Sequence, residues 1–250
     1  MLTAQEVPLK AMDLFADALW KFYETGHATL RIERDDGYRS TEDIGWYLTT
    51  FRDFLPIEKQ ALKFARGRIL DVGCGAGRHS LYLQNRGHRV TAIDVSPRAI
   101  ELARTRGVQD ARVASVCGRL PFRDGEFDTV LLFGNNLGIC GTLPKFRRML
   151  HELDRITSPR GRILATTRQP STTSPRHKSY LRRNLERGRA IGQIRVRLVY
   201  QAQRAPWFDL LLLAPTDLMQ IAAKEGWELT SVFPLDSLEE GYAAVMEKRQ

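Results

Sequence analysis

The amino-acid sequence predicts an α/β protein built on a doubly wound, parallel β-sheet. From Gly67 onward, short apolar runs that suit buried strands alternate with amphipathic helical patterns. A glycine-rich turn, Gly73 to Gly77, joins the first of these strands to the first helix. Strands joined by intervening helices lie parallel, with right-handed crossovers.

The expected elements follow one another closely along the chain. Five strands are expected at 68–73, 89–94, 111–116, 127–134 and 161–167. The first helix extends to Arg86, the second begins at the N-cap Ser96 with Pro97 in its first turn, and a third covers 142–157. A helix at 215–225 and two further strands, WELTSVF and YAAVMEK, close the chain.

Residues 1–66 are expected to form an N-terminal helical cap. Two apolar stripes at helical spacing, 9–22 and 44–55, are separated by the turn Asp35-Asp36-Gly37 and followed by a helix from Pro56 to about Ala65. We expect residues 67–250 to form the main domain. Within it, a basic helix and an antiparallel hairpin are expected as an insertion at about 170–214.

The composition excludes several classes of protein. A chain that is 43% hydrophobic and 27% charged is neither collagen-like nor disordered, and its apolar runs are too short to cross a bilayer. The first residues lack the pattern of a signal peptide. The three cysteines fit neither a disulfide framework nor the spacing of a metal site, so we expect no metal and a reducing, cytoplasmic location.

The positive charge is concentrated in one segment. The net charge is +9, but residues 155–204 alone contain 13 Lys or Arg and one acid, Glu186. Residues 1–62 contain 7 basic and 11 acidic residues. The segment 155–204 therefore has three interpretations: a surface that is solvated or pairs with acidic residues of this or another copy, a site for an anionic small substrate, or a nucleic-acid surface.

The turn Asp71-Val72-Gly73-Cys74-Gly75-Ala76-Gly77 carries the strongest chemical signal. Glycines let a ligand approach the backbone, and the following helix N-terminus offers free N–H groups. A phosphate loop would need Gly-Lys-Ser/Thr, which is absent, and the spacing is not the G-x-G-x-x-G of a dinucleotide site. Asp71 before the glycines suits a ligand with an ammonium group, and Asp94 at the end of the second strand suits the two hydroxyls of a ribose.

With these residues, the sequence resembles the class I S-adenosylmethionine-dependent methyltransferases, and in particular their methyltransferase type 11/25-like domains. ILDVGCGAGRHSLYL is similar to their first motif, VTAIDVSPRAIELAR to their second, and LPFRDGEFDTVLLFGNNLG to the stretch around their fourth strand. The resemblance covers about residues 67–167. It implies a Rossmann-like, seven-stranded sheet, S-adenosylmethionine as cofactor, and a terminal antiparallel pair that includes YAAVMEK.

The resemblance also implies roles for individual residues. Gly73, Cys74, Gly75 and Gly77 would lie against the amino-acid part of the cofactor, Asp71 beside its ammonium group, Asp94 on its ribose and Val95 at the adenine. Many relatives carry an acid shortly before LPF that holds the adenine amino group. This chain has Val116-Cys117-Gly118-Arg119 there, so backbone groups near Cys117 and Gly118 are expected to replace it.

Gly134 and Asn135 follow the fourth strand, where the resemblance places the transferred methyl group. The segment GNNLG differs from the Asn-Pro-Pro-aromatic motif and is more similar to small-molecule N- and O-methyltransferases. No side chain is assigned as catalytic. The candidates for a general base are His79, His151, His177, Tyr47 and Tyr200.

We therefore expect a methyltransferase that acts on an N or O nucleophile of a small molecule, with an anionic acceptor as one alternative. A tRNA or rRNA methyltransferase that uses residues 155–204 is a further alternative, as is a non-catalytic cofactor-binding regulator. A nicotinamide-dependent oxidoreductase is disfavoured by the glycine spacing. No membrane partner is expected, and the sequence does not indicate an oligomeric state.

Overall fold

The computed structural model describes residues 6–249, which form two compact units. The first unit contains the described residues up to Phe54 together with Gly73–Ser115 and Arg195–Phe208. The second contains Leu55–Val72, Val116–Ile194 and the described residues from Asp209 onward. Each unit is thus assembled from segments that are distant in sequence, and the division into a cap of 1–66 and a domain of 67–250 stays a prediction.

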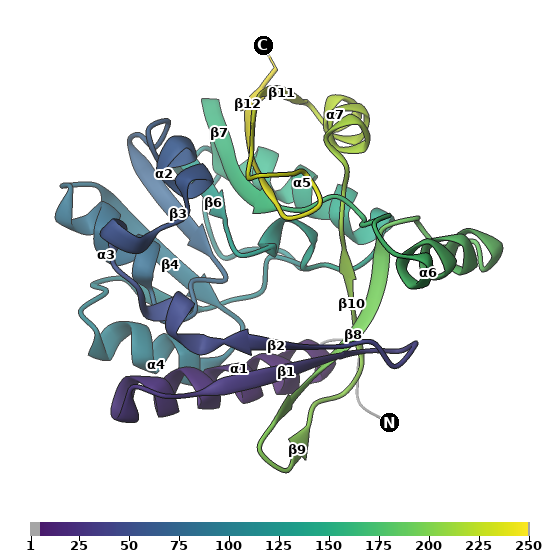
Figure 1. Ribbon diagram of the computed structural model, residues 1–250. Coiled ribbons are helices and arrows are strands. Elements are labelled where there is room, and N and C mark those ends of the chain that lie inside the picture. Colours follow the sequence, from purple (N-terminus) through teal and green to yellow (C-terminus); the bar gives the residue numbers. More distant parts are fainter. Residues whose placement is uncertain (1–5, 250) are drawn as a thin grey trace. The chain divides into compact units, whose positions relative to one another are not determined.

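Within the described residues, seven strands form a mixed sheet in the order β11-β12-β7-β6-β3-β4-β5 (Figure 1). They are β3 (Arg68–Val72), β4 (Arg89–Asp94), β5 (Ala111–Val113), β6 (Phe127–Leu132), β7 (Thr157–Thr167), β11 (Trp227–Pro234) and β12 (Tyr242–Lys248). β6 pairs in parallel with β3 and β7, and β4 with β5. β12 runs antiparallel to β7 and β11, so the predicted α/β sheet and its terminal antiparallel pair are confirmed.

The α-helices lie close to their predicted positions, except that the basic helix α6, expected at 180–189, begins at Pro175. They are α1 (Glu6–Thr25), α2 (Pro56–Leu62), α3 (Arg78–Asn85), α4 (Pro97–Thr105), α5 (Leu143–Ile156), α6 (Pro175–Glu186) and α7 (Pro215–Lys224). α4 begins at Ser96, whose hydroxyl accepts a hydrogen bond from the Ala99 N–H at 3.3 Å. α5 buries Phe146, Leu150 and Leu153 along one face, as its amphipathic pattern requires.

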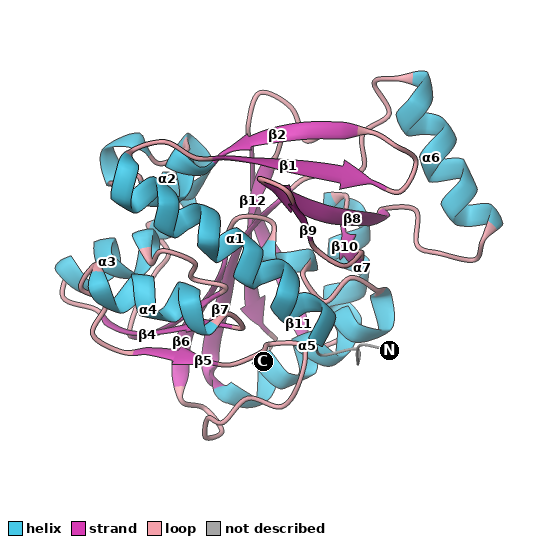
Figure 2. Cartoon of the chain, turned by 90° about the horizontal axis from the view of Figure 1, so that it is seen from below, coloured by secondary structure: helices cyan, strands magenta, loops and turns pink. Residues whose placement is uncertain are grey.

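A second sheet joins the N-terminal region to the basic segment. Its strand order is β10-β8-β1-β2, with β9 paired to β8. The strands are β1 (Thr29–Arg34), β2 (Arg39–Asp43), β8 (Gln193–Tyr200), β9 (Gln203–Arg204) and β10 (Phe208–Leu211). Figure 2 shows β2, β1 and β8 side by side, and the β1–β8 pairing is antiparallel, with Glu33 opposite Arg197.

The prediction that residues 1–66 are helical is wrong for residues 29–43, which form the β1–β2 hairpin. In the first half of β1 the exposed Thr29 and Arg31 alternate with the buried Leu30 and the half-buried Ile32, which is the period of a strand. The turn Asp35-Asp36-Gly37 closes this hairpin and does not merely separate two helices; Gly37 has a φ of +80°.

The second predicted stripe, 44–55, also differs from a single α-helix. It forms two 3₁₀ helices, η1 (Ile44–Leu48) and η2 (Phe51–Asp53). The Asp43 carboxylate accepts a hydrogen bond from the Gly45 N–H at 2.9 Å and so starts η1. Thr49 and Thr50 are extended, which interrupts the helical path. No helix among residues 6–249 is long and apolar enough to span a membrane.

Candidate functional site

The glycine-rich turn between β3 and α3 has a backbone that glycine alone adopts readily. Gly73, Gly75 and Gly77 have φ values of +68°, +53° and +75°. The N–H groups of Gly73 and Cys74 both donate to the Ile93 carbonyl, at 2.8 and 3.0 Å. A Cβ atom on Gly77 would lie 2.5 Å from Val108 Cγ2. The turn is therefore fixed in place within the first unit, with Gly77 as the N-cap of α3.

Asp94 lies directly beside this turn. Its Oδ2 atom accepts a hydrogen bond from the Gly75 N–H at 3.1 Å, and its Oδ1 atom accepts one from the Ser96 N–H at 2.9 Å. The residue is 9% exposed, so its carboxylate is held rigidly at the carboxyl end of β4. The structure thus brings together Gly75 and Asp94, two residues that the sequence predicts for one site; Val95, the next residue, is half-buried.

The N-terminal helix α1 packs against the same region of the first unit. Leu19 Cδ1 lies 3.7 Å from the Cβ position of Gly75. Asp13 Oδ1 lies 2.5 Å from the hydroxyl of Ser96, which donates to it, and Trp20 Nε1 donates to the Arg98 carbonyl at 3.0 Å. The sequence predicts α1 as part of a cap, but these polar contacts with the start of α4 could not be read from its pattern.

The second unit contains Asp71, Gly134 and Asn135. Asp71 is 2% exposed and ends the pairing of β3 with β6, opposite Leu131. Gly134 and Asn135 have consecutive positive φ values of +69° and +68°. The Gly134 N–H donates to Thr166 Oγ1 at 2.8 Å, and the Asn135 N–H donates to the Thr166 carbonyl at 3.1 Å. The segment after β6 is therefore attached to the end of β7.

Asn136 positions the segment after β6, a role that the sequence pattern does not single out. Its Nδ2 atom donates to the Val72 carbonyl at 2.9 Å, one residue after Asp71. This bond joins the segment after β6 to the carboxyl end of β3. The doubled Asn135-Asn136 was a visible signal, because asparagine side chains commonly hydrogen-bond to the backbone in turns.

Cys117 and Cys140 form a disulfide, so the prediction that the cysteines fit no disulfide framework is wrong for this pair. Cys117 is exposed and Cys140 is 5% exposed, while Cys74 is a buried free thiol. The bond links the exposed Cys117-Gly118 segment to the residues that follow η3 (Asn136–Gly138). The sequence hid it because the partners are 23 residues apart and lie on either side of β6 in the chain.

Removal of this disulfide should lower stability substantially. For Cys117→Ser combined with Cys140→Ser, we expect a loss of about 3 kcal/mol in the free energy of unfolding, because a closed loop restricts the unfolded chain. Urea unfolding measures the loss, and a reductant should have no further effect on the variant. Without reductant, the unfolded wild type should titrate one thiol, that of Cys74. Titration of all three of its thiols would contradict the assignment.

The five candidates for a general base all have neighbours in their own unit. His79 packs edge-on against Phe54, with ring centroids 4.9 Å apart, and Tyr47 donates to Glu42 Oε1 at 3.0 Å. His151 Nε2 lies 2.5 Å from Glu225 Oε2, and His177 Nδ1 lies 2.9 Å from the Ser174 hydroxyl. Burial raises the pKa of Tyr200. None of these contacts involves a residue of the glycine turn or the 134–135 segment.

Part of the basic segment pairs with the N-terminal region, as one interpretation of its charge predicts. Arg197 donates from Nη2 and Nε to Glu33 Oε2, at 2.7 and 2.9 Å, across the β1–β8 ladder. Arg31 and Arg39 lie 3.3 and 3.4 Å from Glu33 Oε1. The hydrogen bond from Arg197 is the largest influence that lowers the pKa of Glu33, which therefore stays ionised at neutral pH.

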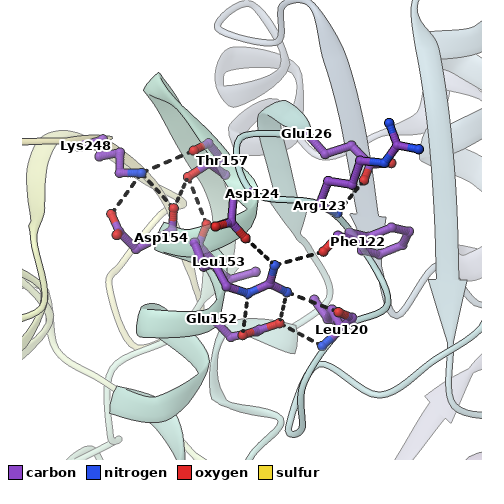
Figure 3. A network of polar contacts seen from close by, with 11 residues as sticks. Leu120, Phe122, Arg123, Asp124, Glu126, Glu152, Leu153, Asp154, Thr157 and Lys248 are labelled. Atoms are coloured by element: carbon purple, nitrogen blue, oxygen red, sulfur yellow. Dashed lines mark hydrogen bonds and ion pairs between the residues drawn. The ribbon is translucent and has the colours of Figure 1, made fainter.

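Arg155 organises a second polar network, in the unit that contains Cys117 (Figure 3). Its Nη atoms donate to the carbonyls of Phe122 and Leu120 at 2.8 and 3.1 Å, and to the carboxylates of Asp124 and Glu152. Glu152 in turn accepts the Leu120 N–H at 2.7 Å. Hence the guanidinium holds the loop that follows Cys117-Gly118 against α5.

Comparison with known proteins identifies the domain. Residues 70–165 match a family model described as a methyltransferase domain. The structure resembles that of a SAM-dependent methyltransferase from Bacteroides fragilis solved with S-adenosyl-L-homocysteine, with a TM-score of 0.80 and 25% identity. This match covers 100% of this chain and 98% of that chain. The fold is that of a class I S-adenosylmethionine-dependent methyltransferase, and residues 70–165 form its methyltransferase domain, as the sequence resemblance predicts.

Two curated relatives match the same region. The malonyl-[acyl-carrier protein] O-methyltransferase of Erwinia pyrifoliae is 37% identical over 102 residues, which is 40% of this chain and 37% of that protein. The ubiquinone biosynthesis O-methyltransferase of Xanthomonas oryzae pv. oryzae is 32% identical over 111 residues, 42% of this chain and 45% of that protein. The chain therefore matches less than half the length of each relative.

Proposed function

We propose that this protein transfers a methyl group from S-adenosylmethionine to an oxygen of a small, anionic acceptor. The observation that carries the proposal is the Asp94 carboxylate bound to the Gly75 N–H at the glycine turn. A carboxylate at the end of the second parallel strand can accept hydrogen bonds from both hydroxyls of a ribose. In this proposal Asp94 holds the ribose of the cofactor, and Val95 lies at the adenine.

The glycine turn fits the rest of such a cofactor. Positive φ values at Gly73, Gly75 and Gly77 keep side chains away from the backbone of the turn, and a Cβ atom at Gly134 would meet nothing within 4 Å. We assign Gly73, Cys74, Gly75 and Gly77 to the amino-acid part of the cofactor. The buried Asp71 carboxylate is assigned to its ammonium group. Backbone groups of Cys117 and Gly118 are assigned to the adenine edge.

The protein's own contribution is to hold groups in place. The bound cofactor supplies a methyl group on a positively charged sulfur, which needs no covalent help from the protein. The Thr166 hydroxyl accepts a hydrogen bond from the Gly134 N–H, and the Asn136 amide donates one to the Val72 carbonyl. These bonds fix the Gly134-Asn135 segment, here called the acceptor edge, before an acceptor arrives. Alignment of an acceptor oxygen with the methyl group lowers the barrier, because the entropy of orienting the two groups is lost on binding and not in the reaction step.

The choice of an oxygen nucleophile is supported by both curated relatives, whose names describe O-methyltransferases. An anionic acceptor is supported by the arginines of residues 155–204. A carboxylate acceptor is ionised at neutral pH and needs no base, which suits a chain in which no side chain is assigned as a base. A cytoplasmic location belongs to the same proposal. Disulfides are rare in reducing compartments, so isolation of the wild type with the Cys117–Cys140 bond formed in the cell would count against this location.

Methyl transfer from labelled S-adenosylmethionine tests this proposal. We expect label on malonyl-acyl carrier protein, whose free carboxylate is anionic, and none on a neutral phenolic ubiquinone precursor; turnover should be lost in Asp94→Ala. An ester product releases methanol in base, whereas an aryl ether does not. Transfer to tRNA alone would contradict the proposed acceptor. Cofactor binding without transfer to any acceptor would favour a non-catalytic cofactor-binding protein.

A further inference from the structure

Two groups stand out among the basic residues of the segment 155–204. Arg155, Arg162 and Arg197 are mostly covered and pair with carboxylates of Glu152, Glu247 and Glu33. A second group lies on α6 and the turn after it and is exposed; it consists of Arg176, Lys178, Arg182, Arg183 and Arg187. α6 contains a single acidic residue, Glu186, whose contact with Arg182 at 3.7 Å is itself exposed. α6 and the turn after it therefore carry five of the 13 basic residues of this segment, and all five are exposed.

Exposed aliphatic side chains lie among these cations. Leu185 is 58% exposed and Ile191 is 41% exposed. They are held on an ordered surface, because α6 buries Tyr180, Leu181 and Asn184 on its opposite side. The Asn184 amide donates to the carbonyls of Ile191 and Gln193 at 3.1 and 2.7 Å, which fixes the turn after the helix. Arginine beside exposed aliphatic groups is a composition found at protein interfaces.

The helix is close in sequence to the acceptor edge proposed for the second unit. α6 begins at Pro175, a short connection after Thr167, the last residue of β7. The neighbouring Thr166 binds the N–H groups of Gly134 through its hydroxyl and of Asn135 through its carbonyl. A partner bound to α6 would therefore contact the stretch of chain that follows Thr166 and Thr167. Figure 2 shows α6 with the two loops that lead into and out of it.

We propose that the surface formed by Arg182, Arg183, Leu185, Arg187 and Ile191, here called the α6 surface, docks an acidic protein that carries the acceptor. The arginines of this surface would pair with carboxylates of the partner. Leu185 and Ile191 would pack against apolar side chains that lie between those carboxylates. A nucleic acid would leave both aliphatic groups against phosphates, and the aromatic ring of α6, Tyr180, is only 4% exposed and unavailable for stacking on bases. The nature of this partner rests on the proposed function.

Binding of malonyl-acyl carrier protein, measured by fluorescence anisotropy without cofactor, tests the α6 surface. Arg182→Glu combined with Arg187→Glu should weaken binding at least ~30-fold, because two attractive charges become repulsive. Leu185→Ser should weaken it about 5-fold without a change of charge. The control, Arg86→Glu with Arg89→Glu, makes the same charge change at two exposed arginines, one directly after α3 and one in β4, and should alter affinity less than about 2-fold. Thermal unfolding checks that each variant is folded.

The possible results separate the partner from the enzyme. Absence of binding to the carrier protein, equal losses in the α6 and control variants, or α6-dependent binding of tRNA or anionic vesicles alone would each overturn the α6 surface as a protein-docking site. Because the assay contains no S-adenosylmethionine, its result does not depend on whether the cofactor binds. Failure of the proposed function appears instead as loss of cofactor binding in a separate titration.

Discussion

Asp94→Ala should weaken binding of S-adenosyl-L-homocysteine by about 100-fold or more. The carboxylate accepts the Gly75 and Ser96 N–H groups and, in our proposal, the ribose hydroxyls. Hydrogen bonds to a charged group contribute about 1.5–3 kcal/mol each, so loss of two ribose contacts accounts for this change. Isothermal titration calorimetry measures the affinity directly, and Asp94→Asn should retain part of it.

The matched control is Asp110→Ala, in the same unit. Asp110 lies just before β5, and its carboxylate accepts hydrogen bonds from Arg112 Nε at 2.7 Å and from Thr91 Oγ1 at 2.8 Å, but no cofactor role is proposed for it. We expect Asp110→Ala to bind S-adenosyl-L-homocysteine with unchanged affinity. If both variants weaken binding equally, the effect is a general loss of structure and Asp94 has no special role.

Arg155→Ala should lower the free energy of unfolding by about 2–4 kcal/mol, because the buried carbonyls of Leu120 and Phe122 lose their donors and Glu152 loses its cation. Chemical denaturation measures this loss. The control is Arg182→Ala, whose ion pair with Glu186 has side chains 74% and 62% exposed; removal of that pair should change stability by less than about 1 kcal/mol. Equal effects of the two substitutions would show that the Arg155 network does not secure its loop.

The same network predicts a dependence of stability on pH. Burial raises the pKa of Glu152, but hydrogen bonds from Arg155 and the Leu120 N–H outweigh it, so the pKa is lower than in the unfolded chain. A lowered carboxylate pKa gives stability that is present above the unfolded value, about 4.3, and is lost as pH falls below it. Wild type should therefore lose more unfolding free energy between about pH 5 and pH 3 than Arg155→Ala does.

The glycine turn and Asp94 were predictable because their geometry is local. Residues 71–94 run from the end of one strand through a helix to the end of the next strand. The backbone of the turn has positive φ at alternate positions, and such a backbone requires the glycines that the sequence displays. The N-cap Ser96 and the amphipathic α5 were predictable for the same reason. Each follows from residues within a few positions of one another.

The features that the sequence concealed depend on contacts between distant segments. Glu33 and Arg197 are 164 residues apart, and their pairing requires β1 to join β8, a partnership that no local pattern specifies. The Cys117–Cys140 bond and the hydrogen bond from Asn136 to Val72 likewise depend on the order of strands in the sheet. The alternation in β1 was short and bounded by charged residues, so the helical stripes on either side obscured it.

Titration of the wild-type protein with S-adenosyl-L-homocysteine in a calorimeter is the most direct test of the central claim. We expect saturable binding of one ligand per chain with a dissociation constant of about 1 μM, and no heat of binding with NAD. Binding of NAD without binding of S-adenosyl-L-homocysteine would contradict the assignment of the glycine turn and Asp94 to a methyl-donor site.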